Sequence, residues 1–435
     1  MTGQTTNAVR LVRSMWPATE PARWSLRRLR HLADIRPSNV DKKSVDGEAN
    51  VRLCNYTDVY YNDSITSDMS FMPATAPLAQ VKRFELRPDD VLVTKDSETP
   101  ADIAIAAHVR DELPGVLCGY HLAILRPLPH VDGRFLVYAL QSRPLAAQTE
   151  VAASGVTRFA LSTGALADLT LPVPGRAEQL AIADFLDRET AKIDALVAKK
   201  QRLVGLLQEK RTALISHAVT KGLDPDVPMK DSGIKWLGEI PAHWQVTPIR
   251  RICDVTTGNR DTVDADADGA YPFFVRSQHI ERIASYSYDG EAVLTAGDGA
   301  GVAKVFHYYC GRFDYHQRVY AFTRFRRVSG KFFYHYLKEN FYKVALDGAA
   351  KSTVDSLRRP LILDFRVCVP PPDEQIHILS FLEGATARVD ALSELVRRAI
   401  RRLEEYRSAL ITAAVTGQID VRIYRRDPAE LVESS

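Results

Sequence analysis

The sequence predicts an α+β protein in which two mixed α/β globular domains are separated by two long helices. Two observations carry this prediction. A stretch with helical patterning at residues 178–220 returns at residues 374–416, and a segment long enough to fold as a domain precedes each copy. The offset, 374 minus 178, is 196 residues and holds without a gap. Because repeats of this length define an architecture, the predicted order is domain, helix, domain, helix, with an internal pseudo-two-fold repeat.

Both repeated stretches are predicted to be long helices. Apolar side chains recur at alternating steps of four and three residues, which is the a/d pattern of a coiled coil sustained for about five heptads. One such helix cannot bury its apolar stripe alone, so the two are predicted to pair as an antiparallel coiled coil. In the first copy Glu189, Lys200, Lys210 and His217 fall in the seam, where charged side chains can snorkel or fix the register. The predicted seam comprises Ile182, Leu186, Ile193, Leu196, Leu203, Leu207, Leu214, Ile378, Leu382, Val389, Leu392, Val396, Leu403, Tyr406 and Leu410.

Four segments follow from this pattern. Proline-rich phrases at residues 171–175 and 369–372 precede the two helices, at the one place where a helix tolerates proline. Short phrases also repeat between the domains, such as Tyr120-His121 and Tyr315-His316. The predicted boundaries are residues 1–171 for the first domain, 172–224 for the first helical region, 225–369 for the second domain with its leading connector, and 370–435 for the second helical region and tail.

Each globular segment mixes strand and helix signals. Short apolar runs bounded by turn residues, such as 51–54 and 90–94, predict strands. Residues 134–142 and 331–340 predict one helix in each domain.

The composition is that of an ordinary globular protein. Of 435 residues, 46% are hydrophobic and 26% charged, and the net charge of +3 neither supports nor excludes a local nucleic-acid-binding surface. Five cysteines without a CxxC motif fit a reducing compartment. No signal peptide and no apolar stretch of membrane-spanning length is apparent. A cytoplasmic protein that does not associate with membranes is expected.

Motifs that carry chemistry are largely missing. The glycine-rich phrase at residues 297–304 lacks the Gly-Lys-Ser/Thr ending of a phosphate-binding loop, so a tight turn between strands is predicted instead. His307, Cys310, Asp314 and His316 are loosely spaced and have no second cluster, so no metal site is predicted. No nucleophile elbow or zinc-protease motif appears. We therefore predict no catalytic residue and no cofactor bound by this chain.

Both domains do offer hydrogen-bond donors in positions typical of loops and strand ends. Arginine and lysine suit guanine edges and phosphates, whereas asparagine and glutamine suit adenine. An ordinary surface role fits any single residue as well, but a set shared by two domains favours DNA. The candidate DNA-binding residues are Asn55, Tyr56, Lys95, His121, Arg158, Arg276, Ser277, Gln278, Lys304, His316, Gln317, Arg318, Lys351, Ser352 and Thr353.

Three phrases resemble a known family. Residues 172–186 and 370–382 place a proline-rich entry before Glu-Gln and an aliphatic-Phe-Leu run, and residues 229–244 read MKDSGIKWLGEIPAHW. In these phrases and in its overall order, the chain resembles the specificity (S) subunit of type I restriction-modification systems. The resemblance implies two target recognition domains, each reading one half of a bipartite, asymmetric double-stranded DNA target through the major groove.

The resemblance also implies partners. The helices would set the unread spacer between the half-sites and dock two modification (methyltransferase) subunits, which bind S-adenosylmethionine and methylate adenine. Restriction subunits, with ATP and Mg²⁺, would complete an endonuclease, and this chain would do no chemistry. The two halves are not interchangeable, because the first helix carries Lys200 and Lys210 at the repeat positions where the second carries Val396 and Tyr406.

Three alternatives stay open at this point. The chain could serve a methyltransferase that acts without a nuclease. It could be a coiled-coil scaffold whose domains bind protein, in which case partner binding would be insensitive to salt, unlike DNA binding. A self-contained enzyme is disfavoured by the missing catalytic motifs.

Overall fold

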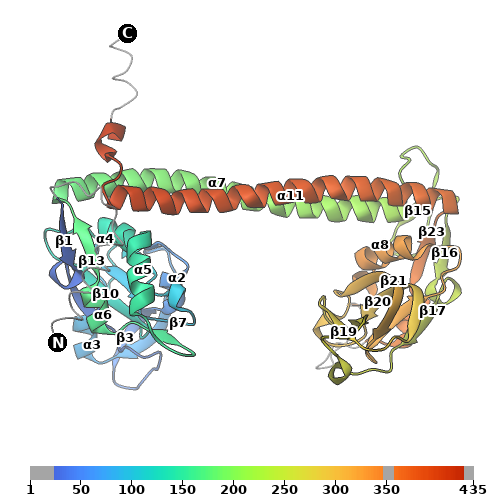
Figure 1. Cartoon of the computed structure of the whole chain (residues 1–435), viewed down its shortest axis with the longest axis horizontal. Coiled ribbons are helices and arrows are strands. Elements are labelled where there is room, and N and C mark those ends of the chain that lie inside the picture. The colour runs from blue at the N-terminus through green and yellow to red at the C-terminus, as the bar shows by residue number, and fades with distance from the viewer. Residues whose placement is uncertain (1–23, 346–356, 426–435) are drawn as a thin grey trace, which may run out of the picture. The chain divides into compact units, whose positions relative to one another are not determined.

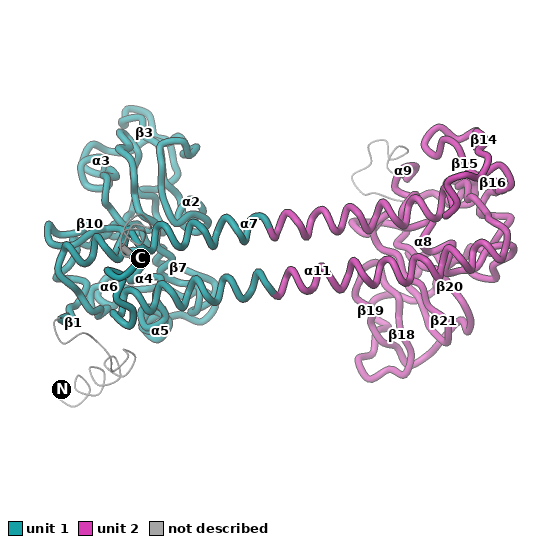
Figure 2. The backbone as a smooth tube through the Cα atoms, turned by 90° about the horizontal axis from the view of Figure 1, so that it is seen from above, with its two compact units in different colours: residues 1–199, 399–435 teal, residues 200–398 magenta. Residues whose placement is uncertain are grey.

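The computed structural model describes residues 24–345 and 357–425. The candidate residues Lys351, Ser352 and Thr353 lie outside these ranges. The chain forms two compact units, residues 1–199 with 399–435 and residues 200–398 (Figure 2). Each unit therefore contains one globular part and one segment of each long helix, and the two units are described separately.

In unit 1, a five-stranded sheet is enclosed on both faces. Alternate residues of one central strand belong to different cores: Val91 and Val93 pack with the helices, and Leu92 packs with a smaller sheet. This alternation is the period-two pattern of a strand covered on both sides. The strand order is β2 (Ala33–Pro37), β10 (Leu122–Pro127), β6 (Val91–Thr94), β8 (Ala106–Val109) and β4 (Ser64–Ile65).

The smaller sheet of unit 1 contains a parallel strand pair. Its order is β5 (Met72–Ala76), β3 (Ala49–Cys54) and β9 (Val116–Cys118). β3 and β9 run parallel, with Cys54 opposite Cys118. The carboxyl ends of these two strands therefore meet at one edge.

Helices cover the other face of the large sheet (Figure 1). The backbone N–H of Phe135 donates to Asp132 Oδ1 at 3.1 Å, which caps the first of them. Phe135 shares a core with Ile182 and Leu186 of one long helix and with Ile411 of the other. The helices are α4 (Gly133–Leu140), α5 (Arg143–Ala152), α6 (Thr163–Asp168) and segments of α7 (Arg176–Lys221) and α11 (Pro372–Val415).

Shorter elements complete unit 1. They are β1 (Ser25–Arg28), η1 (Leu29–His31), α2 (Tyr56–Tyr60), α3 (Leu78–Phe84), β7 (Asp96–Ser97), η2 (Pro100–Asp102), β11 (Ser154–Gly155), β12 (Phe159–Ala160) and β13 (Thr170–Val173), with η6 (Val421–Arg425) after α11.

Unit 2 is built on a six-stranded sheet that also contains a parallel pair. β18 and β21 run parallel, with Phe274 opposite Tyr315. The strand order is β17 (Asp254–Thr257), β22 (Val319–Thr323), β20 (Tyr288–Ala296), β21 (Phe306–Tyr315), β18 (Tyr271–Phe274) and β19 (Ile280–Ile283).

The helix layer of unit 2 is centred on α8 (Gly330–Asn340), whose cap is Ser329. Phe332 and Tyr336 of α8 are fully buried and share a core with Trp244, with Ile215 of α7 and with Ile378 of α11. The remaining elements are β14 (Met229–Asp231), β15 (Glu239–Pro241), β16 (Gln245–Pro248), η3 (Ile249–Arg251), η4 (Thr262–Asp264), η5 (Gly299–Gly301), α9 (Tyr342–Ala345), α10 (Arg359–Asp364) and β23 (Arg366–Val369).

The segments of α7 and α11 run antiparallel within each unit. In unit 1, Ile182 and Ile411 share a core, and further along α7 Asp194 meets Arg407, so rising residue numbers on one helix meet falling numbers on the other. In unit 2, Arg211 meets Asp390 in the same sense. The mixture of helix and strand in each unit agrees with the predicted fold class, whereas a coiled coil along the whole length stays a prediction.

The predicted register of the helix seam is wrong in the middle of one of its two rows. Leu196, Leu203, Leu392 and Tyr406 are 40–57% exposed. By contrast, the row that includes Ile193, Leu207, Val389 and Val396 is buried, together with the seam ends Ile182, Leu186, Ile378 and Leu382. Leu214, Leu403 and Leu410 are half-buried.

In this row, the residue that follows each predicted seam position is the one that is buried or half-buried. Val197 and Val204 are half-buried in α7, and Ser393 is buried in α11. An α-helix has 3.6 residues per turn, so a strict spacing of 3.5 drifts around the helix. The sequence did not reveal this, because Leu196-Val197 and Leu203-Val204 are adjacent apolar pairs.

No helix within residues 24–345 and 357–425 is both long enough and apolar enough to cross a bilayer.

Candidate nucleic-acid interface

In unit 1, three chain segments meet where parallel strands end. Asn55 and Tyr56 directly follow β3, and His121 lies just beyond β9. Lys95 follows β6, and its backbone N–H donates to the His121 carbonyl at 3.0 Å. The fold therefore brings Asn55, Tyr56, Lys95 and His121 to one edge, although up to 66 residues separate them in the sequence.

Aromatic and charged side chains are interleaved at this edge. The Lys95 ammonium lies 5.4 Å from the centre of the Tyr120 ring, and the rings of Tyr120 and His121 are 4.1 Å apart. His121 Nδ1 lies 2.6 Å from Asp96 Oδ2, which fixes the imidazole. Tyr120 is 48% exposed. A cation over an exposed ring offers both charge and a stacking surface to a nucleic acid.

A pocket of about 750 Å³ adjoins this cluster and includes Arg158. Tyr56 and Tyr60 stack in its wall with ring centres 5.4 Å apart. The Tyr60 hydroxyl donates to Asp102, and this hydrogen bond to a carboxylate raises the pKa of Tyr60 to about 12. Tyr61, also in the wall, is 76% exposed. The pocket thus joins two candidates, Tyr56 and Arg158, to tyrosines that the sequence did not single out.

In unit 2, the equivalent edge gathers two candidate groups. Arg276, Ser277 and Gln278 follow β18, and His316, Gln317 and Arg318 follow its parallel neighbour β21. The His316 N–H donates to the Phe274 carbonyl at 3.0 Å, which joins the two strand ends.

Hydrogen bonds to neighbouring loops hold these segments. The Gln278 amide donates to the Lys304 carbonyl at 3.1 Å, and His307 Nε2 contacts the Ser277 carbonyl at 3.0 Å. The Gln317 amide donates to Asp261 Oδ2 at 2.6 Å. The loops on both sides of the strand ends are thereby fixed relative to each other.

One carboxylate, Asp298, lies against two of the candidate arginines. Arg276 Nη1 is 3.0 Å from Asp298 Oδ1, and Arg318 Nε is 3.7 Å from Asp298 Oδ2. The Asp298 side chain is 15% exposed, whereas those of Arg276 and Arg318 are 47% and 63% exposed. Sequence reasoning missed Asp298, whose only signal is its place inside the glycine-rich phrase.

Glycines at residues 297–301 permit this close approach. A Cβ on Gly297 would lie 2.9 Å from the Arg318 carbonyl oxygen, and one on Gly301 would lie 2.5 Å from that of Arg276. Both distances are shorter than real Cβ contacts. The phrase lies between β20 and β21, as predicted, but the connection spans residues 297–305 and includes η5, so it is longer than the predicted tight turn.

His316 has an unusual environment within the cluster. Its Nδ1 accepts a hydrogen bond from the Arg318 N–H at 2.9 Å, and its Nε2 lies 3.7 Å from Asp261. Burial, and secondarily the charge of Arg276, lower the pKa of His316. A neutral imidazole is required for Nδ1 to accept, so this residue orients the backbone of Arg318.

The four residues considered as metal ligands in the sequence do not form one cluster but lie in separate environments. Cys310 is exposed, His307 contacts the Ser277 carbonyl, and Asp314 accepts from Ser287 Oγ at 2.6 Å. Among the described residues, no group of three or more potential ligands converges on one point.

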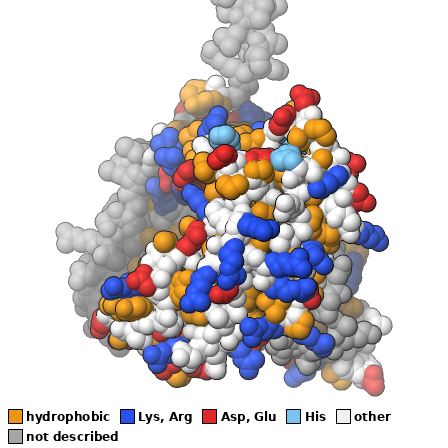
Figure 3. Space-filling model, turned by 90° about the vertical axis from the view of Figure 1, so that its right-hand side faces the viewer, with side chains coloured by type: hydrophobic (Ala, Val, Ile, Leu, Met, Phe, Trp, Pro, Cys, Tyr) orange, Lys and Arg blue, Asp and Glu red, His pale blue; other side chains and the backbone are white. Residues whose placement is uncertain are grey.

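Basic side chains gather on one side of unit 2. On the face drawn in Figure 3, Lys and Arg side chains lie close together over its middle and lower part, with fewer Asp and Glu among them. A net charge of +3 for the chain thus conceals a local concentration of positive charge.

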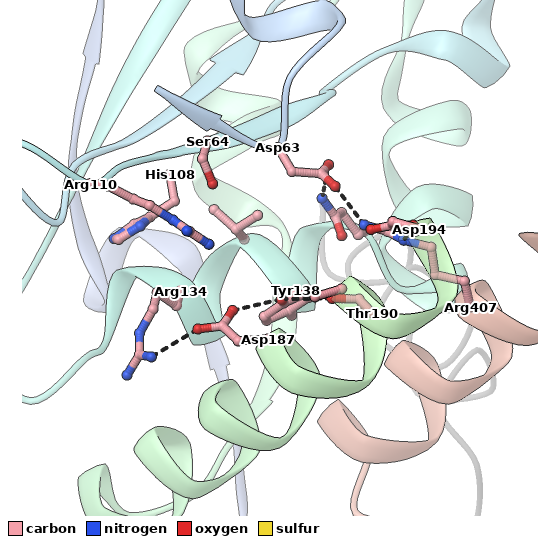
Figure 4. Close-up of a pocket in the computed structure, with 13 residues that line it drawn as sticks. Asp63, Ser64, His108, Arg110, Arg134, Tyr138, Asp187, Thr190, Asp194 and Arg407 are labelled. Carbon is pink, nitrogen blue, oxygen red and sulfur yellow. Dashed lines mark hydrogen bonds and ion pairs between the residues drawn. The ribbon is translucent and has the colours of Figure 1, made fainter. Parts of the chain in front are cut away.

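A second pocket of unit 1, about 150 Å³, lies between the globular part and the long helices (Figure 4). Arg134 Nη1 contacts Asp187 at 3.0 Å, and the Tyr138 hydroxyl donates to the same carboxylate at 2.7 Å. Arg407 Nε lies 2.9 Å from Asp194, and its Nη2 contacts Asp63. These mutual contacts indicate a joint between domain and helices rather than a site for a ligand.

Known proteins were compared with the chain. No protein-family model matches it. Over 182 residues, 42% of this chain and 40% of the relative, it is 31% identical to the type I restriction enzyme EcoDI specificity subunit of Escherichia coli. Over 386 residues, 83% of this chain and 81% of the relative, it is 22% identical to the StySPI specificity subunit of Salmonella potsdam.

A solved structure supports the same relationship at the level of the fold. The chain resembles one from a study of complex assembly and conformational transition in a type I restriction-modification system, with a TM-score of 0.70. The match covers 93% of this chain and 100% of the other, at 14% identity. In sequence and in fold, this chain therefore resembles the specificity subunits of type I restriction enzymes, which confirms the resemblance seen in its sequence.

Proposed function

We propose that the chain is the non-catalytic DNA-specificity subunit of a type I restriction-modification complex. Each globular part reads one half of a bipartite, asymmetric target. The long helices set the spacer and dock two methyltransferase subunits, and restriction subunits complete the complex. S-adenosylmethionine, ATP and Mg²⁺ belong to those partners.

The observation that carries the proposal is the gathering of donors at equivalent edges of the two units. In unit 1 the edge follows β3 and β9, and in unit 2 it follows β18 and β21. Polar and aromatic side chains held on rigid strand ends are suited to reading base edges. The local concentration of Lys and Arg on unit 2 supports phosphate contacts.

Reciprocal contacts support the predicted pseudo-two-fold repeat. Asp194 and Asp390 are equivalent in the 196-residue repeat, and so are Arg211 and Arg407. Asp194 of α7 binds Arg407 of α11, while Arg211 of α7 binds Asp390 of α11. Each helix supplies its aspartate to the arginine of the other, as in an isologous interface.

Exposed apolar residues support docking on the helices. Leu392, Leu395 and Tyr406 of α11 are 44%, 58% and 57% exposed. Leu196, Leu203 and Leu206 of α7 are 40–51% exposed and recur at helical spacing. Apolar side chains of this size on a rod are suited to a protein partner.

Comparing adenine methylation in the host with and without the gene tests the proposal. The expected result is a split motif, two specific half-sites with an unread spacer, that disappears on deletion. Unchanged methylation, together with no binding of the purified chain to duplex DNA at low salt, would favour the protein-binding scaffold. Duplex binding that weakens steeply with salt would support DNA recognition.

The spacer role has its own test. Four residues inserted after Lys199 would lengthen α7 by about 6 Å at 1.5 Å per residue. The expected result is a longer unread spacer with both half-sites unchanged. Altered half-site bases would contradict a spacer role for the helices.

A further inference from the structure

We propose that Arg276 and Arg318 each read a guanine in the half-site of unit 2, and that Asp298 is the residue that positions both. This inference rests on the proposed function. It goes further by naming two bases and the residues that select them.

The two arginines converge because of the strand topology. β18 and β21 are parallel neighbours, so the residues that follow them emerge at one edge. β20 is antiparallel to β21 and ends at Ala296, opposite Val319, which places the 297–301 loop at the same edge. Arg276, Arg318 and Asp298 therefore come together from three separate segments.

Asp298 contacts only part of each guanidinium. Arg276 approaches through Nη1 and Arg318 through Nε. An arginine has five N–H donors, so the contact with Asp298 leaves Nε and Nη2 of Arg276, and both terminal nitrogens of Arg318, for a ligand. In the described part of the chain, no other carboxylate is paired with either guanidinium.

The remaining donors match guanine. Arginine makes bidentate hydrogen bonds to O6 and N7 of guanine in the major groove, and this is the commonest specific contact of arginine with a base. The guanidinium of Arg276 is hydrogen-bonded to Asp298 and so loses less conformational entropy on binding. Arg318 Nε lies at ion-pair distance, 3.7 Å, from the same carboxylate. An isolated surface ion pair would need no such construction, yet here the carboxylate is largely buried and no Cβ fits at Gly297 or Gly301.

The charge also favours an electron-rich ligand. Two guanidinium groups share the Asp298 carboxylate, so these three side chains together carry one net positive charge. The imidazole of His316 adds no charge, because its Nδ1 accepts a hydrogen bond from the Arg318 N–H and is therefore unprotonated. Guanine N7 and O6 present two acceptors to this edge.

Arginine-to-lysine variants separate base reading from phosphate binding. Lysine keeps the charge but loses the planar, two-pronged geometry. We therefore expect Arg276→Lys and Arg318→Lys each to relax one G·C position in the half-site of unit 2. Discrimination at that position should fall by about 5- to 150-fold, the usual range for one bidentate pair. The measurements are the methylated motif in a host carrying each variant and binding of the full chain to a library of randomised duplexes.

Asp298→Asn tests the positioning role. The amide keeps the shape but removes one negative charge, so we expect weaker discrimination at both G·C positions with no loss of affinity for non-specific duplex. Arg312→Lys is the matched control for the two lysine variants, because Arg312 pairs with Asp289 at 3.0 Å in an exposed pair on the same sheet. It should leave the motif unchanged.

Two outcomes would overturn the inference. If the lysine variants keep the wild-type motif, and alanine variants weaken binding to all duplexes equally, the arginines bind phosphates. If the motif contains no G·C position that responds to either arginine, the assignment is wrong although DNA recognition stands. A wild-type chain with no sequence preference at all would instead contradict the proposed function.

Discussion

The indole N–H of Trp244 donates to Glu374 Oε2 at 3.0 Å, and Trp24 makes the corresponding bond to Glu178 Oε2 at 3.1 Å. Glu178 and Glu374 are 196 residues apart, so they occupy the same place in the repeat. In each unit, the first turn of a long helix is thus tied to the tryptophan that opens the globular part. A carboxylate in the first turn is also favoured by the helix dipole.

Removing one of these carboxylates should lower the stability of the unit to which it belongs. Glu374 also lies 2.8 Å from His243 Nε2, so Glu374→Gln weakens two contacts while keeping the shape. We expect a loss of about 1–3 kcal/mol in the free energy of unfolding of unit 2, as for hydrogen bonds to charged groups. The urea midpoint, followed by tryptophan fluorescence, measures it.

The control for this variant is Glu383→Gln. Glu383 pairs with Lys331 at 3.6 Å and its side chain is 73% exposed. Exposed pairs contribute little, so the midpoint should hardly move. Equal shifts from both variants would contradict a special role for Glu374.

We expect Gln179 and Gln375 to contribute more to the stability of their units than Glu178 and Glu374 do. The buried amide of Gln179 accepts from the Asp132 N–H at 2.9 Å and donates to the Pro174 and His130 carbonyls. Replacement with Leu would leave these buried groups without partners, at a cost of about 2–5 kcal/mol. Hydrogen exchange should show faster opening of α4 in Gln179→Leu.

Gln375→Leu is the reciprocal control. Gln375 accepts from the Ser329 N–H at 2.9 Å and donates to the Arg327 and Pro370 carbonyls. Its loss should accelerate exchange in α8 and spare α4. If either variant opens both helices equally, the glutamines do not act locally.

Arg407 should be coupled to its partners more strongly than its repeat equivalent, Arg211. Burial alone would lower the pKa of Arg407, but Asp63 and Asp194 outweigh it and raise the pKa. Arg211 contacts Asp390 alone among the ion pairs seen in residues 24–345 and 357–425. Double-mutant cycles with Asp194 and Asp390 should give about 1–2 kcal/mol for the first pair and under about 1 for the second. Equal coupling energies would contradict a stronger pair at Arg407 than at Arg211.

Local sequence patterns predicted much of this fold. The helix predicted at 178–220 is α7 at Arg176–Lys221, and the one predicted at 331–340 is α8 at Gly330–Asn340. Periodicity and proline entry points are local properties, so they can be read without a structure. The division into compact units was harder to predict from the sequence, because each long helix contributes one segment to each unit.

The candidate site was only partly predictable for the same reason. Donors such as Arg276 and Arg318 stand out in sequence, whereas Asp298 acquires its role from strand pairing that brings together residues 22 and 20 positions away. Asp96 and Tyr60 were missed because their partners, His121 and Asp102, are distant in the chain. An acidic residue also suggests a surface that repels DNA, unless the structure shows the arginine with which it is paired.

The corrected helix seam gives a direct test. Val396 is 6% exposed and Leu392, a predicted seam residue, is 44% exposed. Val396→Glu would bury a charge and should cost several kcal/mol, about 3 or more. Leu392→Glu should change stability by less than about 0.5 kcal/mol while weakening assembly with a methyltransferase partner. Thermal unfolding and co-purification separate these effects, and strong destabilisation by Leu392→Glu would restore the predicted register.

Unit 2 should lose stability as the pH falls below neutral. Burial, with the charges of Lys331, Lys338 and Arg211, lowers the pKa of His335 to about 4, against an ordinary value of about 6.5. Between these values the unfolded chain binds a proton that the folded chain does not, so stability is lost progressively from about pH 6.5 toward pH 4. Replacing His335 with Gln removes this term, and its urea midpoint should fall less steeply over that interval. Burial raises the pKa of the neighbouring Glu339, so the folded chain takes up this proton more readily than the unfolded chain does. Protonation of Glu339 therefore opposes the loss of stability. If His335→Gln and the wild type lose stability in parallel between pH 6.5 and 4, protonation of His335 does not cause the acid sensitivity of unit 2.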